Sequence, residues 1–290
     1  MSILSIFLLI FLGIIIFFVI IMVVDTHRLV TRDYAICSSG ILNDIRIVLL
    51  SDLHSKSFGK DNKKLTDEIT RLNPDLVLIA GDMYTALKKD TGINASKLLT
   101  NLAKKYPIYY ADGNHEQKTS LLPGEFDIDY NAYFDKLNAA GVVHLNNEAA
   151  VLPQWGIKIY GLTLPFEYYR KMSSKYPEVS LIEELIGRPD KDMMNILIAH
   201  NPRYFDRYAE WGADLTVSGH VHGGLMRLGR LGGVISPNLK FFPKYSGGQY
   251  KADDSDSVMV LSCGLGTHHL PIRIFNPAEI SCIDIKKKTT

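Results

Sequence analysis

The stretch IRIVLLSDLH, residues 45–54, is an apolar run that stops at an aspartate and a histidine. The stretch LVLIAGD, residues 76–82, repeats the pattern and ends in a second aspartate. Short, continuous runs of β-branched and other apolar residues are typical of strands that are buried on both faces. In open α/β sheets, ligands bind outside the carboxyl ends of the strands. Asp52, His54 and Asp82 are therefore predicted to lie at a binding edge of a largely parallel sheet.

Strand and helix patterns alternate through most of the remaining chain. Between the first two strands, Leu65, Ile69 and Leu72 recur at helical spacing, and Pro74 ends that helix. The further expected strands are 108–110, 157–160, 196–199, 215–217 and 258–261, and the further expected helices carry the apolar groups within 98–106, 133–137 and 204–208. Short connections between alternating strands and helices favour α/β layering around largely parallel sheets.

Polar motifs follow the expected strands in a fixed order along the chain. Beyond the first two aspartate motifs they are Gly113-Asn114-His115-Glu116, His200-Asn201-Pro202 and Gly219-His220-Val221-His222. Because most of these motifs directly follow a strand, residues far apart in sequence are expected to converge on one edge. Carboxylate, amide and imidazole donors without thiolates suit divalent ions. In a two-metal site, one carboxylate must also bridge ions held about 3.5–4 Å apart.

Each motif taken alone has an ordinary structural explanation. An aspartate after a strand usually forms a turn or caps a helix, Gly113-Asn114 is a turn signal, and His200 alone could be a hydrogen-bonded core residue. With 22 glycines and 9 histidines in 290 residues, chance would produce a G-H-x-H pattern only about 0.02 times. Five of the nine histidines fall within the ordered motifs. The complete series therefore indicates a two-metal hydrolase.

Composition limits the classes of protein to which the chain can belong. At 290 residues it can hold one large domain or two small ones, and 47% hydrophobic with 22% charged residues can build a substantial core. The formal net charge of +1 gives no global field toward nucleic acid, so no nucleic-acid partner is expected. Cys37, Cys263 and Cys282 stand singly without CxxC spacing and are expected to be buried, inert thiols.

The N-terminal segment has the composition of a membrane span. No charged residue occurs from Ser2 to Val24, and the helix from Ile3 to Val24 would be about 33 Å long against a hydrocarbon core of roughly 30 Å. A cleaved signal peptide is the alternative, but no Lys or Arg precedes the run and no small-x-small site follows it. We expect an uncleaved single-pass anchor, and Arg28 and Arg32 behind it weakly favour a cytoplasmic catalytic domain.

The ordered series D-x-H, G-D, G-N-H-E, H and G-H-x-H resembles that of the calcineurin-like metallophosphoesterase superfamily over roughly residues 44–283. A closer likeness to membrane-anchored bacterial phosphoesterases of the YkuE and YaeI kind rests on SDLHSK at 51–56, SGHVHGG at 218–224 and GLGT at 264–267 leading to PIR at 271–273. The likeness implies a four-layer α-β-β-α sandwich of two mixed β-sheets, with the metals at one edge. The expected parts are a transmembrane anchor at 1–24, a connector at 25–43 and the metallophosphoesterase domain at 44–290.

The resemblance implies a role for each polar residue of the motifs. The implied metal ligands are Asp52, His54 and His222 for the first ion, Asn114, His200 and His220 for the second, and Asp82 as the bridge between them. His115 would lie near the leaving oxygen, where it donates a proton or stabilises charge. Glu116 would orient His115 by a hydrogen bond, and a structural ion pair is an equally good alternative for it.

These roles imply a membrane-anchored phosphoesterase that hydrolyses phosphate-ester or pyrophosphate bonds by a metal-bridged hydroxide. Two divalent ions would lower the pKa of the bridging water and neutralise the phosphoryl oxygens. Mn²⁺, Fe, Zn²⁺ or Co²⁺ suit mixed nitrogen and oxygen ligands, whereas Mg²⁺ takes imidazole poorly. The anchor favours a substrate at or near the plasma membrane, such as a lipid-linked phosphate or a nucleotide-diphosphate lipid of the UDP-diacylglucosamine type.

Two other classes of protein compete with this hypothesis. A catalytically silent, membrane-tethered binding scaffold could keep the fold without the chemistry, although the ligand set is complete. A metal-dependent peptidase or amidohydrolase would need HExxH or a related helical pair, and the sequence has neither.

The residues that would contact the substrate are less well defined by the sequence than the metal ligands are. The cations Arg227, Arg230, Lys244 and Arg273 follow the last metal motif, and Arg273 is the first candidate for a phosphate contact.

Overall fold

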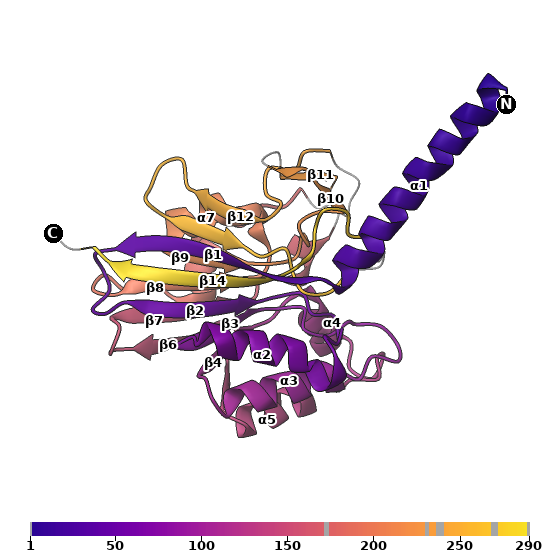
Figure 1. Cartoon of the computed structure of the whole chain (residues 1–290). Helices are drawn as coiled ribbons and strands as arrows, with labels where there is room; N and C mark the ends of the chain where they lie inside the picture. The colour runs from indigo at the N-terminus through magenta and orange to yellow at the C-terminus, as the bar shows by residue number, and fades with distance from the viewer. Residues whose placement is uncertain (1, 171–173, 230–231, 236–240, 268–271, 289–290) are drawn as a thin grey trace.

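In the computed structural model, a long N-terminal helix stands out from a layered α/β body (Figure 1). The structure describes residues 2–170, 174–229, 232–235, 241–267 and 272–288. Helix α1 (Ile3–His27) is long and apolar enough to cross a membrane, and most of its apolar side chains are exposed. The helix continues past the expected end at Val24, and Asp25 in its last turn is buried against the body.

The first of two six-stranded sheets carries the earlier motifs. Its strands follow the order β1 (Leu29–Ser38), β14 (Ala278–Lys287), β2 (Ile45–Leu50), β3 (Leu76–Ala80), β4 (Ile108–Ala111) and β5 (Val142–His144). β14 runs antiparallel to β2, and all the other neighbours in this sheet are parallel. The carboxyl ends of β2, β3 and β4 therefore share one edge.

The second sheet carries the later motifs. Its strands follow the order β12 (Gly248–Lys251), β13 (Val258–Leu261), β9 (Leu215–Ser218), β8 (Met194–Ala199), β7 (Ile157–Leu162) and β6 (Glu148–Leu152). The four central strands are parallel, and the two outer strands are antiparallel to their neighbours. A separate two-stranded hairpin is formed by β10 (Met226–Arg227) and β11 (Gly233–Ile235).

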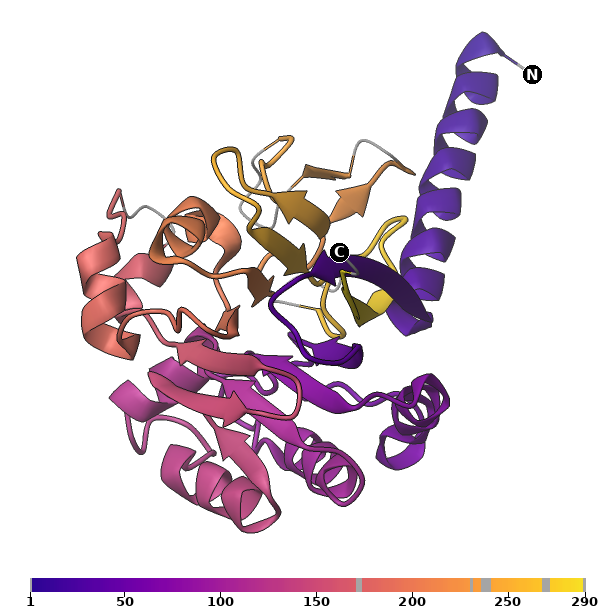
Figure 2. The ribbon, with the colours of Figure 1, turned by 90° about the vertical axis from the view of Figure 1, so that its left-hand side faces the viewer.

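The two sheets pack face to face, and helices cover their outer faces (Figure 2). Between the sheets, Ile47 and Leu78 of the first sheet pack in one cluster with Ile196 and Val217 of the second. The outer face of the first sheet is covered by α2 (Lys63–Leu72), α3 (Ile93–Ala103) and α5 (Tyr130–Ala139), and that of the second by α6 (Val179–Ile186) and α7 (Phe205–Trp211). The expected α/β class with two mixed sheets is confirmed.

The seven strands predicted from apolar runs are all present, as β2, β3, β4, β7, β8, β9 and β13. Leu65, Ile69 and Leu72 form the buried face of α2, as their spacing predicts. The helix expected around 204–208 comprises η3 (Pro202–Tyr204) followed by α7, and Tyr106 lies beyond the end of α3. The short elements that complete the body are η1 (Lys60–Asn62), α4 (Asn114–Leu121) and η2 (Phe166–Tyr169).

The segment 25–43, expected as a connector, is partly built into the first sheet. β1 pairs with β14 along its whole length, from Leu29 opposite Ala278 to Ser38 opposite Lys287. β1 is an outer strand whose side chains alternate between exposed and buried from Asp33 to Cys37, and no continuous apolar run marks it. The same alternation places Cys37 on the exposed face, so the expectation of a buried thiol is wrong there. Cys263 and Cys282 are buried as predicted.

Candidate metal centre

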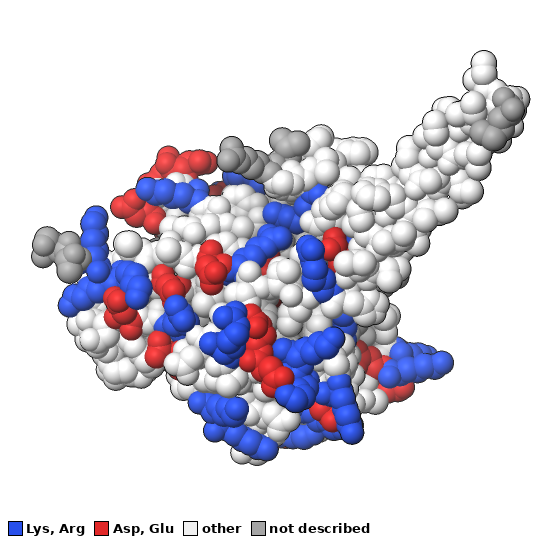
Figure 3. Space-filling model, in the orientation of Figure 1, with Lys and Arg blue, Asp and Glu red and all other residues white. Residues whose placement is uncertain are grey.

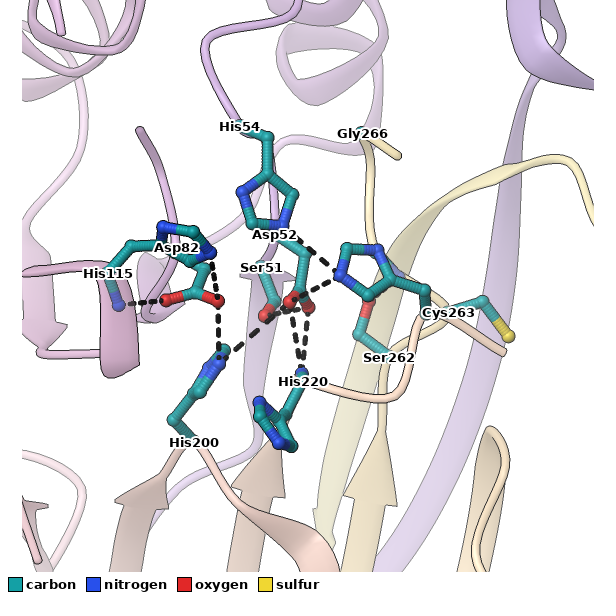
Figure 4. A network of polar contacts seen from close by, with 12 residues as sticks. Ser51, Asp52, His54, Asp82, His115, His200, His220, Ser262, Cys263 and Gly266 are labelled. Atoms are coloured by element: carbon teal, nitrogen blue, oxygen red, sulfur yellow. Dashed lines mark hydrogen bonds and ion pairs between the residues drawn. The ribbon is translucent and has the colours of Figure 1, made fainter. Parts of the chain in front are cut away.

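Strand ends from both sheets bring the sequence motifs to one edge of the body (Figure 4). In the first sheet, Asp52 follows β2, Asp82 follows β3, and α4 begins with Asn114 after β4. In the second sheet, His200 follows β8 and His220 follows β9. The carboxyl ends of these parallel strands meet at this edge. The convergence expected from the sequence is therefore observed.

Asp52, His54 and His222 form the first group of potential metal ligands. One ligand atom from each lies within 4.8 Å of the others. Nε2 of His222 is 3.4 Å from Oδ1 of Asp52 and 3.1 Å from Nε2 of His54. All three side chains are buried. Two imidazole nitrogens beside a buried carboxylate are a donor set that suits a divalent cation.

Asp82, His200 and His220 form the second group, again with ligand atoms within 4.8 Å of one another. Nε2 of His200 is 3.1 Å from Oδ2 of Asp82. Oδ1 of Asn114 at the same edge is buried and has no hydrogen-bond partner among the described residues. A buried acceptor without a donor is costly unless an ion or a water binds it. Asn114 is therefore the candidate fourth ligand of this group.

Asp82 lies where the two groups meet. A third group of potential ligands, which consists of His54, Asp82 and His115, shares one residue with each of the first two. The Asp82 carboxylate lies between His115 and His200 (Figure 4). The three groups therefore form one continuous centre, and Asp82 occupies the position that a bridging carboxylate needs.

The backbone of the centre is held in an unusual conformation. Five of the candidate ligands have positive φ angles of 48–75°, namely Asp52, His54, Asp82, His220 and His222. Side-chain-bearing residues adopt this left-handed conformation only where the surroundings impose it, commonly at functional sites. Gly113 and Gly219 allow the close packing, because a Cβ on Gly113 would meet the Asp82 carboxylate and a Cβ on Gly219 would meet Ser51.

The electrostatics of the centre favour added positive charge. Burial raises the pKa of Asp52 to about 6, and Asp82 adds to the shift while His200 opposes it. Burial lowers the pKa of His200, but the carboxylates of Asp82 and Asp52 outweigh burial and raise it to about 10. Metal ions bind the deprotonated forms of such ligands and displace their protons. The centre could hold two divalent ions, and its mixed nitrogen and oxygen donors do not select among Mn²⁺, Fe, Zn²⁺ and Co²⁺.

His115 presents an N–H group to the centre. Its Nδ1 accepts a hydrogen bond of 2.7 Å from the main-chain N–H of Ala86. The proton of the neutral ring therefore resides on Nε2, which lies 4.0 Å from Oδ2 of Asp82. The main-chain N–H of His115 also donates to Oδ1 of Asp82 at 2.9 Å. This tautomer makes the ring a donor rather than a lone-pair ligand.

Glu116 holds the loop of Asp82, and its recorded hydrogen bonds come from other groups than the His115 ring, which Glu116 is expected to orient from the sequence. Its buried carboxylate accepts hydrogen bonds of 2.7–3.0 Å from the main-chain N–H groups of Asp82, Met83 and Gly113 and from the hydroxyl of Tyr110. Glu116 is the third residue of α4, where a glutamate folds back over the helix N-terminus as in a capping box. Burial raises its pKa to about 8, and the nearby Asp82 adds to the shift.

The cations expected to contact phosphate have other roles. The buried Arg273 guanidinium donates to the carbonyl oxygens of Cys263, Gly264, Gly266, Asn276 and Pro277. It thereby braces the loop whose Gly266 N–H donates to the carbonyl oxygen of Asp52. The buried Arg227 likewise donates to the carbonyl oxygens of Gly223, Ser246 and Gly247. Lys244 is exposed, and Arg230, like Pro271 of the PIR motif, lies outside the described residues.

Two residues of the centre lie outside all of the sequence motifs. The Tyr169 ring is 5.7 Å from the His220 ring and 6.2 Å from the His200 ring, measured between centroids. Nδ2 of Asn276 donates to the carbonyl oxygens of His222 and Gly224, each at 2.7 Å. Neither residue follows a predicted strand, so the strand-end argument could not find them.

Comparison with known proteins agrees with this geometry. The family model described as calcineurin-like phosphoesterase matches residues 45–224. The metallophosphoesterase YkuE of Bacillus subtilis is 25% identical over 286 residues, which cover 90% of this chain and 87% of the relative. The likeness to YkuE expected from the short motifs is confirmed.

Two further relatives carry informative names. A transmembrane protein with metallophosphoesterase domain from Danio rerio is 27% identical over 253 residues, covering 85% of this chain and 54% of the relative. The UDP-2,3-diacylglucosamine pyrophosphatase LpxG of Chlamydia muridarum is 21% identical over 287 residues, covering 83% of each chain. This chain spans about half the length of the animal relatives that it matches.

Proposed function

The chain belongs to the calcineurin-like phosphoesterase family, and we propose that it is a membrane-anchored hydrolase of phosphate-ester or pyrophosphate bonds that uses two divalent metal ions. One observation carries this proposal: two groups of potential ligands lie side by side at one edge of the body, and His54 of the first group and Asp82 of the second are themselves close together beside His115. In this arrangement a cation in one group would lie next to a cation in the other. Such pairs of neighbouring cations are typical of enzymes that cleave phosphate esters.

The first proposed metal position is formed by Asp52, His54 and His222, and the second by Asn114, His200 and His220, with Asp82 shared between them. When bound, two divalent ions supply Lewis-acid chemistry that activates water and neutralises phosphoryl oxygens. The centre includes no thiolate, which leaves Mn²⁺, Fe, Zn²⁺ and Co²⁺ as candidate ions.

His115 is the proposed proton donor. Water adds to phosphorus, the bond from phosphorus to the leaving oxygen breaks, and that oxygen needs a proton or a hydrogen bond as its charge develops. The Ala86 N–H holds Nδ1 of His115, so Nε2 carries the proton and faces the centre. Glu116 supports this step indirectly, because it fixes the main chain of Asp82, to which the His115 N–H donates.

The proposed substrate is a phosphate ester or pyrophosphate attached to a lipid. The apolar helix α1 would hold the enzyme at the plasma membrane as a single-pass anchor. One relative is named for hydrolysis of a lipid-linked pyrophosphate, UDP-2,3-diacylglucosamine. The guanidinium groups of Arg227 and Arg273 donate to backbone carbonyl oxygens. Among the described residues, the proposed phosphate contacts are therefore the metal positions and His115.

Hydrolysis of bis-p-nitrophenyl phosphate by the detergent-solubilised full chain with Mn²⁺ tests the proposal. We expect about two metal ions per chain by elemental analysis, and a loss of about 100-fold or more in turnover for His115→Ala with metal content retained. Asn138→Ala, which alters an exposed side chain on α5, is the control and should keep full turnover. If metal-loaded protein cleaved neither this diester, a phosphate monoester nor a lipid pyrophosphate, the silent scaffold would replace the enzyme.

A further inference from the structure

Four large apolar side chains are exposed on the body close to the base of α1. They are Leu228, Phe241, Phe242 and Phe275, with exposed fractions of 39%, 70%, 64% and 41%. Soluble surfaces rarely gather large aromatic side chains in one place unless the patch binds something. We refer to these four residues as the hairpin surface.

Backbone contacts show that the hairpin surface is one continuous layer. Met226 of β10 pairs both with Ile235 of β11 and with Ile274, the neighbour of Phe275. Ile235 in turn pairs with Phe241, and the N–H of Phe242 donates to the carbonyl oxygen of Val234 at 2.9 Å. Phe241 and Phe242 are therefore joined by backbone contacts to β11, and the chain next to Phe275 is joined to β10.

The hairpin surface continues directly onto α1. The Phe275 ring lies edge-on to that of Phe18, with 6.5 Å between centroids. Phe275 also lines a shallow hollow together with Ile20, Ile21 and Val24 of α1, and Asp25 and Arg28 close it at the end nearest the body. In both ribbon views, β10 and β11 rise beside the C-terminal part of α1, on the side of the body from which the helix leaves (Figures 1 and 2). Apart from atoms that are not described, an uncharged surface extends from α1 toward this region (Figure 3).

We propose that the hairpin surface is a second membrane contact, which lies in the interfacial layer of the bilayer that α1 crosses. This inference rests on the anchoring role of α1 in the proposed function. Aromatic side chains are favoured at the level of the lipid headgroups, where their rings are partly desolvated. A second protein is a less suitable partner for the hairpin surface than lipid. Because this surface is continuous with a membrane helix, a protein bound to it would itself have to contact lipid.

The contact would place the metal centre next to the bilayer surface. Only three residues separate His222 from Met226, where β10 begins. The N–H of Leu225 donates to the carbonyl oxygen of Ile235 at 2.7 Å, and a Cβ on Gly224 would meet the same oxygen. The loop of a proposed metal ligand is thus packed on the hairpin, and a lipid-linked substrate could reach the centre without leaving the membrane.

Depth-dependent quenching of tryptophan fluorescence by brominated phospholipids tests the contact in the full chain reconstituted in phosphatidylcholine–phosphatidylglycerol vesicles. Phe242→Trp is the probe, and Val151→Trp is the matched control, since Val151 is also exposed but lies on β6 at the outer edge of the second sheet. The unmodified chain gives the background from Trp155 and Trp211. Phe241→Trp is a second probe if the first variant does not fold.

We expect brominated acyl chains to reduce the added fluorescence of Phe242→Trp to about half or less, because interfacial side chains reach about 5–10 Å into the headgroup and acyl boundary. Val151→Trp should be unaffected. If the protein floats with the vesicles and Phe242→Trp is quenched no more than Val151→Trp, the proposal is overturned. A blue-shifted but unquenched signal would mean that protein covers the surface, and would overturn it equally.

Two controls separate this inference from the proposed function. Chain that does not float with the vesicles would refute the anchor and the membrane contact together. Hydrolysis of the soluble bis-p-nitrophenyl phosphate should equal that of the unmodified chain in both variants, because neither Phe242 nor Val151 belongs to the metal centre. If the unmodified chain did not hydrolyse this diester, only the proposed phosphoesterase activity would be refuted. The membrane contact would still be tested, because quenching is measured independently of activity.

Discussion

The two halves of the metal centre differ in their connection to α1. We call Asn114, His200 and His220 the interior half, and Asp52, His54 and His222 the anchor-side half. The interior half is tied to the first sheet and to α4. Nδ1 of His200 is 2.5 Å from the carbonyl oxygen of Ala80, the last residue of β3. The chain that follows this carbonyl is held by Glu116, which sits two residues after Asn114 in α4.

The anchor-side half is connected to the last turn of α1. The carbonyl oxygen of His222 accepts from Asn276, whose main-chain N–H donates to the Asp25 carboxylate at 3.0 Å. Two residues after His54, the Lys56 ammonium group donates to the carbonyl oxygen of Thr26. Asp25 and Thr26 both belong to α1. A change at the membrane anchor should therefore reach the anchor-side half first. It should reach the interior half only indirectly, through the hydrogen bonds from the main-chain N–H of His54 to the carbonyl oxygen of Asp82 and from the main-chain N–H of His220 to the Asp52 carboxylate.

Asp82→Ala should affect both halves of the centre equally, because the Asp82 carboxylate is the proposed shared ligand of both metal ions. We expect elemental analysis to show loss of both metal ions and turnover to fall by about a thousand-fold or more, which corresponds to roughly 4 kcal/mol of transition-state stabilisation. Asp67→Ala on the exposed face of α2 is the matched control and should change neither quantity. Full metal content and full turnover in Asp82→Ala would falsify the bridging assignment.

Glu116→Gln should weaken the interior side without removing a ligand. The amide nitrogen of glutamine would face main-chain N–H donors, so at least one of the hydrogen bonds from Asp82, Met83 and Gly113 is lost. An unpaired buried donor lowers the free energy of unfolding by about 1–3 kcal/mol. Urea unfolding measures this change, and Glu184→Gln on α6, which is exposed, is the control. Unchanged stability together with unchanged turnover would show that Glu116 does not hold the Asp82 loop.

The central strands and the ligands at their ends could be predicted because both follow from a local pattern. Strands buried on both faces must be apolar throughout, so β2, β3 and β8 stand out as continuous runs. The polar residue that ends such a run then lies at the binding edge. The arrangement of the strands in two sheets was predicted only from the family likeness. The order of strands in a sheet depends on contacts between distant segments, which the spacing of apolar residues does not reveal.

The supporting residues were missed or misassigned because their partners are backbone groups. Arg273 has the sequence context of an exposed loop cation, yet it is buried among carbonyl oxygens supplied by 263–266 and 276–277. Glu116 could have been identified, because a glutamate three residues after Gly113 fits a capping box. Asn276 carries no comparable signal. Its role is apparent only from the tertiary structure, in which Asn276 connects Asp25 of α1 with the loop of His222.

Asn276→Ala should separate the two halves. It removes the hydrogen bonds to the carbonyl oxygens of His222 and Gly224, and it leaves every residue of the interior half in place. Loss of a group that orients a metal ligand typically costs about 10–100-fold in metal affinity. A metal titration should therefore show one site weakened by about that factor and the other unchanged. Asn43→Ala, far from the centre on an exposed turn, is the control, and equal weakening of both sites would contradict the division.

Lys56→Met should give the smallest effect and is the most specific test of the link to α1. Methionine keeps an unbranched apolar side chain, but it removes the ammonium group, which lies 4.5 Å from the centroid of the Phe58 ring and donates to the carbonyl oxygens of Thr26 and Leu265. A cation at a helix C-terminus typically contributes about 0.3–1 kcal/mol, which corresponds to about a two- to five-fold change in an equilibrium constant. Because His54 precedes Lys56 by two residues, this change should appear in the metal affinity of the anchor-side half.

The same metal titration in vesicles measures the effect, with Lys105→Met in the exposed turn after α3 as the control. In the double variant with Asn276→Ala, the two losses should combine in the same site, since both contacts transmit the position of the last turn of α1. If Lys56→Met weakened metal binding in the interior half alone, the influence of α1 on the centre would have to pass through the sheets. The proposed direct link between α1 and the anchor-side half would then be wrong.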